Sequence, residues 1–298
     1  MANPQAPGLL PGFRGQRISV DGVEIFLETG GAGPPLLLLH GYPETHLMWH
    51  RVAPRLARKY TVVCPDLRGY GDSAKPAGLA DHANYSKRAM AADMVGVMAA
   101  LGHDKFLLAG HDRGARVAYR LALDHPRAVQ KLALLDIVST KAAYEQGGMA
   151  LAVAYFHWYF LIQPSPFPET LIGADPKFYL DTIFRKWTNN PQAFDEAALA
   201  EYLRVFSDPA CIHATCECYR AGATLDLEND RRDVAAGHKI ECPNLVLWGA
   251  QSVVGKLCQP LETWRDLIAQ PQGQALPCGH FLPEEAPEET LKALQAFF

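Results

Sequence analysis

The sequence predicts an α/β fold in which a mostly parallel sheet of eight strands carries helices on both faces. Two observations predict it. Short apolar segments rich in strand-forming residues alternate with helical patterns over most of the 298 residues, as in parallel sheets with helical crossovers. Residues 140–237 break that alternation, because they contain few strand-like runs and many aromatic residues and helix formers. They therefore predict a helical cap inserted between the sixth and seventh strands, with a core made of residues 1–139 and 238–298.

The strands are expected in a regular order along the chain. Asp21-Gly22 joins the first two, and this pair is favoured in the tight turn of an antiparallel hairpin. The third strand is a run of four leucines behind Pro34-Pro35, and its lack of polar alternation predicts burial on both faces. The eight expected strands span residues 17–20, 23–28, 36–39, 61–64, 106–109, 132–135, 245–248 and 274–276.

The composition excludes several functional classes. A net charge of −4, with acidic and basic residues interspersed, offers no footprint for nucleic acid or for an anionic membrane surface. Residues 1–14 lack the basic and apolar regions of a signal peptide, and no apolar run is long enough to span a bilayer. Seven cysteines, an odd number, favour reduced thiols, and a cytoplasmic protein is therefore expected.

One group of residues is a candidate for metal binding. Cys211, His213, Cys216 and Cys218 lie close together in the sequence. No second pair of ligands follows at the spacing of a zinc finger, and small buried thiols are common packing residues. We therefore expect these residues to pack, and we expect neither a metal nor a cofactor.

Asp112 lies in the pentapeptide Gly110-His111-Asp112-Arg113-Gly114, between an expected strand and a helical pattern that begins near Ala115. Glycines in this strand–turn–helix context permit the strained turn of a nucleophile elbow, which lifts one side chain above the sheet. A serine there forms an acyl-enzyme, whereas a carboxylate displaces a leaving group from saturated carbon and holds an alkyl ester. The alternative is an aspartate that only caps the following helix. The flanking glycines favour the nucleophile.

A histidine and a second acid are needed beside this nucleophile. His280 follows the last expected strand, and the chain order nucleophile, acid, histidine is typical of triads in this topology. His40 lies in a turn and we expect His111 to point away from the elbow, so His280 is the expected base. No carboxylate follows Trp248-Gly249 closely, so Asp136, at the end of the sixth strand, is the expected orienting acid. The alternative is that Asp136 only caps the end of this strand and has no catalytic role.

Two backbone amides and two arginines complete the pattern. Tyr42 follows His40-Gly41 after the third strand, and its N–H and that of Arg113 are expected to hold a carboxylate oxygen and later an oxyanion. Arg113 and Arg116 follow the nucleophile within one helical turn. Isolated arginines usually form surface ion pairs, but two guanidinium groups beside a nucleophile suit a small carboxylate. The pattern therefore favours a substrate with a carboxylate group.

Together, residues 110–116, 156–164 and 276–280 resemble the fluoroacetate (haloacetate) dehalogenases of the α/β-hydrolase superfamily. The resemblance covers about residues 12–298. The elbow is shared with epoxide hydrolases and haloalkane dehalogenases, whereas the two arginines, the His157-Trp158 pair and residues 218–221 are more specific. One departure is Ala115, where the family pattern has glycine.

The resemblance implies a role for each matching residue. Asp112, His280 and Asp136 would form the catalytic triad, and Arg113 and Arg116 the carboxylate clamp. His157, Trp158 and Tyr219 would receive the leaving halide, and Trp187 would line the pocket. An imidazole, an indole and a phenol are three hydrogen-bond donors, which suits fluoride. The plainer alternative for these aromatic residues is packing inside the cap.

The expected activity is therefore hydrolytic dehalogenation of a short 2-haloacid such as fluoroacetate, which gives glycolate and halide through an ester at Asp112. An epoxide hydrolase that uses the same ester is the alternative, with Tyr155, Tyr159 and Tyr219 as candidate acids. A receptor that binds a small acid without turnover is a third, less favoured interpretation. The expected partners are the haloacid and water, with no nucleic acid or membrane, and the resemblance implies a homodimer.

Overall fold

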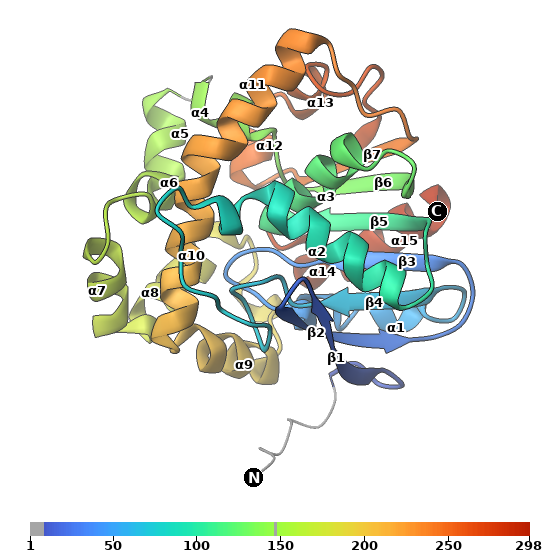
Figure 1. The fold of residues 1–298 in the computed structure, drawn as a ribbon, viewed down its shortest axis with the longest axis horizontal. Helices are drawn as coiled ribbons and strands as arrows, with labels where there is room; N and C mark the ends of the chain where they lie inside the picture. The colour runs from blue at the N-terminus through green and yellow to red at the C-terminus, as the bar shows by residue number, and fades with distance from the viewer. Residues whose placement is uncertain (1–8, 146–147) are drawn as a thin grey trace.

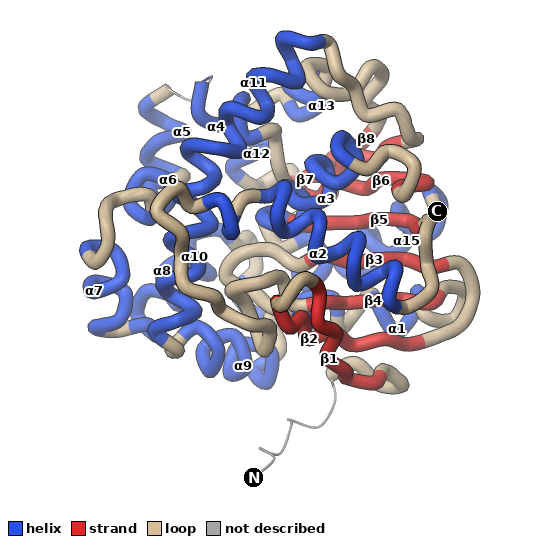
Figure 2. The backbone as a smooth tube through the Cα atoms, in the orientation of Figure 1, coloured by secondary structure: helices blue, strands red, loops and turns tan. Residues whose placement is uncertain are grey.

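A single eight-stranded sheet forms the centre of the computed structural model, which describes residues 9–145 and 148–298 (Figures 1 and 2). The strand order is β1-β2-β4-β3-β5-β6-β7-β8. β1 and β2 form an antiparallel hairpin, β2 runs antiparallel to β4, and the remaining neighbours are parallel. The strands are β1 (Arg14–Val20), β2 (Val23–Gly30), β3 (Pro35–Leu39), β4 (Thr61–Pro65), β5 (Phe106–His111), β6 (Val129–Leu135), β7 (Asn244–Gly249) and β8 (Gly273–Leu276).

The predicted α/β class and all eight expected strands are confirmed, but several strands are longer than expected. β5 continues through Gly110 to His111, because these residues pair with Leu134 and Leu135 of β6. Glycine and histidine have little intrinsic strand preference, so only the pairing with a neighbouring strand places them in the sheet. β5 therefore ends directly before Asp112.

Helices cover both faces of this sheet (Figure 1). In the view of Figure 1, α2 and α3 cross the near face, while α1 and α15 lie behind the strands. The core helices are α1 (Ala53–Leu56), α2 (Lys87–Ala100), α3 (Asp112–Asp124), α12 (Val253–Leu257), α13 (Pro260–Trp264), α14 (Leu282–Glu285) and α15 (Pro287–Phe297). Single 3-10 turns occupy His46–Trp49 and Ala83–Tyr85.

The segment between β6 and β7 is helical, as the aromatic-rich composition predicts, and it lies at the end of the sheet on the left of Figure 1. Its helices are α4 (Thr140–Glu145), α5 (Met149–Ala154), α6 (Phe156–Leu161), α7 (Phe167–Ala174), α8 (Pro176–Trp187), α9 (Glu196–Phe206), α10 (Pro209–Ala221) and α11 (Leu227–Ala236). A 3-10 turn spans Pro191–Ala193, and a π-helical turn, Gly222–Asp226, joins α10 to α11. We call these helices the cap.

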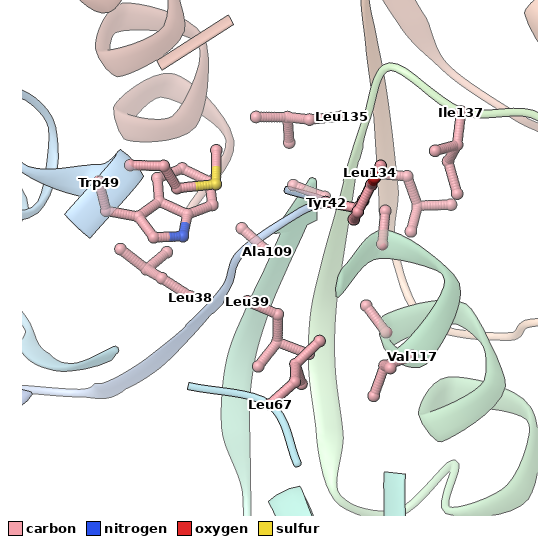
Figure 3. Close-up of a cluster of buried hydrophobic side chains, with 14 of the residues drawn as sticks. Leu38, Leu39, Tyr42, Trp49, Leu67, Ala109, Val117, Leu134, Leu135 and Ile137 are labelled. Carbon is pink, nitrogen blue, oxygen red and sulfur yellow. The ribbon is translucent and has the colours of Figure 1, made fainter. Parts of the chain in front are cut away.

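The hydrophobic core lies between the sheet and its helices. Leu38, Leu39, Ala109 and Leu134 come from three adjacent strands and are fully buried beside Val117 of α3 (Figure 3). The burial of these central strands on both faces holds the ends of β3, β5 and β6 in a fixed arrangement. Within residues 9–145 and 148–298, no helix combines the length and the apolarity that crossing a bilayer requires. Residues 1–8, part of the segment expected not to be a signal peptide, lie outside the described residues.

Candidate active site

Asp112 occupies a sharp turn between β5 and α3. Its backbone has a positive φ of 43°, a conformation that costs a non-glycine residue free energy and that recurs at functional sites. The turn is possible because glycines flank it: a Cβ at Gly114 would lie 2.3 Å from the carbonyl oxygen of His40, and one at Gly110 would lie 2.6 Å from that of Gly114. The helix begins at Asp112, so the expectation of a start near Ala115 is wrong by one turn.

The carboxylate of Asp112 is buried and accepts a hydrogen bond from the backbone N–H of Tyr42, with 3.0 Å between nitrogen and Oδ1. Gly41 permits this approach, because a Cβ there would lie 2.8 Å from Cβ of Asp112. Within the described residues, the second expected donor, the N–H of Arg113, forms no hydrogen bond with this carboxylate. Burial opposes ionisation of Asp112, but His280, His111 and the two arginines outweigh it and lower its pKa to about 2. The side chain is therefore an anion at neutral pH.

His280 lies beside Asp112 and is hydrogen-bonded to Asp136. Nδ1 of His280 is 2.6 Å from Oδ2 of Asp136, and Nε2 is 3.9 Å from Oδ2 of Asp112. Nε2 has no hydrogen-bond partner among the described residues. Burial lowers the pKa of His280, but the hydrogen bond and charge of Asp136 and the charge of Asp112 raise it above the ordinary histidine value. The ring is thus held by Asp136, and its other nitrogen lies on the side of Asp112.

Asp136 follows β6 in a second positive-φ turn, with φ of 51°. Its other oxygen, Oδ1, accepts hydrogen bonds from the N–H of Gly249 at 2.9 Å and from the hydroxyl of Ser252 at 2.7 Å. Both carboxylate oxygens of this buried acid are therefore satisfied, as a buried charge requires. Asp136 lies at the expected strand end. Its two donors are the last residue of β7 and a serine shortly after it, in the segment where the sequence has no carboxylate.

Arg113 and Arg116 are almost completely buried beside Asp112. The guanidinium carbon of Arg113 lies 4.0 Å from the ring centre of Tyr219, and that of Arg116 lies 4.4 Å from the ring of Trp158. Such stacking stabilises a cation and fixes its plane. Nε of each arginine has no hydrogen-bond partner within the described part of the chain. Each side chain therefore keeps a donor available for an anion.

The three expected halide donors come together from two cap helices. His157 and Trp158 lie on α6 and Tyr219 lies on α10, with ring centres of His157 and Tyr219 5.6 Å apart. Nδ1 of His157 and the hydroxyl of Tyr219 are buried without a partner among the described residues. Burial lowers the pKa of His157 well below its ordinary value, so its imidazole is neutral and carries one N–H at neutral pH. Two buried polar groups without partners, on rings whose centres are 5.6 Å apart, are typical of a ligand site.

Trp187 also borders the site. Its ring centre is 4.5 Å from that of His157 and 5.3 Å from that of His280, and its carbonyl oxygen accepts the N–H of His280 at 3.0 Å. A cavity of about 230 Å³ reaches His280 between the cap and α12. Its polar lining includes Tyr155, Lys186, Trp187, Ser252 and Lys256. This cavity therefore borders His280, and Asp112 is not among its lining residues.

Sequence reasoning missed a buried acidic pair behind His280. Glu44 and Glu284 are fully buried, and Oε2 of Glu44 lies 3.4 Å from Nδ1 of His111. Burial raises the pKa of Glu44 to about 8, so this acid is mainly protonated at neutral pH. The ring of His111 packs at 4.6 Å on that of His280, so the expectation that His111 points away from the site is wrong. Glu44 follows a turn, where charged side chains are usually exposed, so the sequence alone does not indicate that it is buried.

The cysteine cluster does not assemble around one point. Cys211, Cys216 and Cys218 are buried along α10, whereas His213 pairs with Glu169 of α7 at 3.1 Å. The structure, as far as it is described, contains no group of three or more His, Cys, Asp or Glu side chains arranged to hold a metal ion.

Comparisons with known proteins identify the family and agree with the fold. The chain matches the family model of the alpha/beta hydrolase fold over residues 34–287. It is 46% identical to a fluoroacetate dehalogenase of Burkholderia sp over 97% of this chain and 95% of that protein. It is 34% identical to a soluble epoxide hydrolase of Corynebacterium sp over 94% of this chain and 95% of that protein. A solved structure from Nostoc sp, described as an alpha/beta hydrolase, superimposes with a TM-score of 0.94 at 56% identity, covering 96% of this chain and 97% of that chain.

Proposed function

We propose that this chain hydrolyses a short 2-haloacid through an ester at Asp112. The chain belongs to the haloacetate dehalogenase family of the α/β-hydrolase superfamily. It is a dehalogenating hydrolase, and fluoroacetate, which would give glycolate and fluoride, is the substrate we propose. One observation carries the proposal: an ionised carboxylate at a strained turn lies beside two buried arginines that each keep a free donor. The pair of cations would be costly to bury unless an anion joined them.

In the first step, Arg113 and Arg116 hold the substrate carboxylate and present its α-carbon to Asp112. A carboxylate oxygen of Asp112 forms a bond to that carbon as the carbon–halogen bond breaks, and the halide leaves with the bonding electrons. The N–H, indole and hydroxyl groups of His157, Trp158 and Tyr219 donate hydrogen bonds to the departing halide. Fluoride gains most from these donors, because its negative charge is the most concentrated.

In the second step, His280 removes a proton from water, and the resulting hydroxide attacks the carbonyl carbon of the Asp112 ester. The bond between this carbon and the glycolate oxygen then breaks, the glycolate oxygen takes the proton from His280, and Asp112 loses its own proton to return to the carboxylate. The Tyr42 N–H stabilises the developing oxyanion. Esterification removes the negative charge of Asp112, one of the charges that raise the pKa of His280. Loss of this charge lowers the pKa of His280, which favours the neutral base at the stage where a base is required.

Epoxide hydrolysis remains the second candidate, because the buried Tyr219 hydroxyl has no partner among the described residues and a relative at 34% identity bears that name. Fluoroacetate, chloroacetate and small epoxides should be tested in parallel, with halide measured by electrode and diol by chromatography. We expect halide release and no diol, and no halide from Asp112→Ala. Diol formation alone would support the epoxide hydrolase, and binding of the acid without any turnover would support a receptor.

The ester itself is tested separately. A single turnover of haloacetate in heavy-oxygen water should place the label in Asp112, because water attacks the carbonyl carbon of the enzyme. Mass spectrometry of the peptide that contains Asp112 measures this. Label in glycolate alone, with none in the protein, would exclude the ester mechanism.

We also propose a homodimer and a cytoplasmic location. All seven cysteines are free thiols, which is typical of proteins from a reducing compartment. Large apolar side chains are exposed on the cap, and such residues are common at subunit contacts: Met149, Val153, Phe167, Leu171 and Phe178. Light scattering should give twice the chain mass, and Phe178→Glu should reduce it. Cell fractionation tests the location.

A further inference from the structure

Cys218 lies between two buried cations. Its sulfur is 3.1 Å from Nζ of Lys87 and 3.2 Å from Nη2 of Arg113. Cys218 is completely buried, and each of the two cations is 1% exposed. The three residues come from different elements, since Lys87 begins α2, Arg113 lies in α3 and Cys218 belongs to α10 of the cap. The sulfur thus joins the cap to the core next to Asp112.

The charges around this sulfur favour an anion there. Lys87 has a carboxylate partner, because Oδ2 of Asp226 lies 3.4 Å from its Nζ. Arg113 forms no ion pair with a carboxylate of the described residues, and its Nη2 donates hydrogen bonds to the carbonyl oxygen and the sulfur of Cys218. A guanidinium buried without a counter-charge is strongly destabilising. The charge of Asp112 also acts on Arg113, and of the acceptors that contact this guanidinium among the described residues, the sulfur is the one that can ionise.

Two other cysteines of the same helix provide a contrast. Cys211 and Cys216 are equally buried, and burial raises the pKa of Cys211 to about 12 and that of Cys216 further. Burial acts on Cys218 in the same direction, but Arg113 and Lys87 outweigh it and lower the pKa of this thiol below its ordinary value. The titratable side chains near the sulfur include Tyr70, Tyr85, Lys87, Arg113 and Tyr219.

We propose that Cys218 is a thiolate in the folded enzyme and a positioning residue for the substrate-carboxylate clamp. It engages Nη2 of Arg113 and leaves Nε free for the substrate. The role in substrate binding rests on the proposed function, whereas the ionisation of the sulfur does not. The substrate carboxylate is held equally before and during the displacement, so loss of this anchor raises KM more than it lowers kcat.

The ionisation is tested by ultraviolet absorption, because a thiolate absorbs where a thiol does not. The difference in absorption between wild type and Cys218→Ser should correspond to one thiolate at neutral pH. An ordinary cysteine, with a pKa of about 8.5, is mostly a thiol at that pH. The matched control, Cys216→Ser, should give no such difference. Absence of the thiolate signal from folded wild type at neutral pH would overturn the proposal, whatever the activity.

The positioning role is tested by kinetics on three variants. Cys218→Ser and Cys218→Ala should raise KM for haloacetate roughly tenfold to a hundredfold, which corresponds to the usual strength of hydrogen bonds between charged groups. Cys218→Asp restores an anion and should return KM close to that of wild type, while Cys216→Ser should not change it. A serine variant with the KM of wild type would refute the role of the charge. If wild type released no halide, the proposed function would fail, and the absorption difference would still decide the state of Cys218.

Discussion

Nε2 of His280 lies 3.9 Å from Oδ2 of Asp112, too far for a hydrogen bond, while Nδ1 of the same ring is 2.6 Å from Asp136. A serine nucleophile needs a base in contact to remove its proton, but an ionised carboxylate needs none. The gap between the two side chains is therefore compatible with a base that acts on water only after the ester has formed.

Replacing this base should separate the two steps. His280→Gln should still release halide in the first turnover, because Asp112 remains ionised, and should then stall as the ester. Steady-state turnover should fall roughly a hundredfold to ten-thousandfold, the usual contribution of a general base. Rapid-quench halide measurement and intact-protein mass spectrometry check this. Asp112→Asn is the control and should give no burst.

The two steps should also differ in pH dependence. Asp112 has a pKa of about 2, so halide release in the first turnover should stay constant down to about pH 3. Ester hydrolysis needs neutral His280, whose pKa in the free enzyme is raised, so this step should slow as the pH falls. Asp112 carries no charge in the ester, so the pH midpoint of ester hydrolysis should lie below the pKa of His280 in the free enzyme. NMR titration of His280 measures that pKa. Parallel pH profiles for the two steps would contradict this assignment.

His157→Ala should reduce defluorination more than dechlorination. Loss of a preorganised donor costs roughly a hundredfold or more where charge develops, and chloride leaves with less assistance. Initial rates of halide release from fluoroacetate and chloroacetate measure the ratio. His213→Ala, a cap histidine that pairs with Glu169, is the matched control and should change neither rate. Equal losses for both halides would remove the fluoride-specific role of His157.

Arg116→Lys should raise KM for haloacetate by roughly tenfold to a hundredfold with a smaller effect on kcat. Lysine keeps the charge but loses the planar donor pair and the stacking on Trp158. Arg120→Lys is the matched control, because Arg120 lies one turn further along α3 and pairs with Asp233 instead. Steady-state kinetics distinguish the two variants, and an unchanged KM in Arg116→Lys would remove this residue from the clamp.

Gly114→Ala should lower the free energy of unfolding by roughly 1–3 kcal/mol, the usual cost of overpacking. The new methyl group would meet the backbone oxygens of His40 and Leu39, which separates the elbow from β3. Activity should fall as well, because the same contact aligns Asp112 with the Tyr42 amide. Gly173→Ala is the control: it lies exposed in α7 with nothing near its Cβ position. Chemical denaturation measures both, and equal stability of the two variants would contradict the packing account.

Much of the site could be predicted from local patterns. Asp112, Asp136 and His280 each follow an expected strand, and parallel strands end at the same edge of a sheet, so their proximity follows from the topology. His157, Trp158 and Tyr219 were expected beside them only because of the family resemblance, since helical periodicity does not say which face of a cap helix meets the core. The start of α3 and the orientation of His111 were mispredicted, because pairing with β6 and the packing of Gly114 decide both.

The sequence by itself determined the succession of strands along the chain, the helical character of the segment between the sixth and seventh strands and the residue types of the elbow, because hydrophobic periodicity and turn residues act between neighbours in the chain. Only the tertiary structure decided the electrostatics. Glu44 meets His111 and Cys218 meets Lys87 and Arg113 across separations of 67, 131 and 105 residues. Their charge states depend on burial and on partners brought close by folding, and neither is a property of the local sequence.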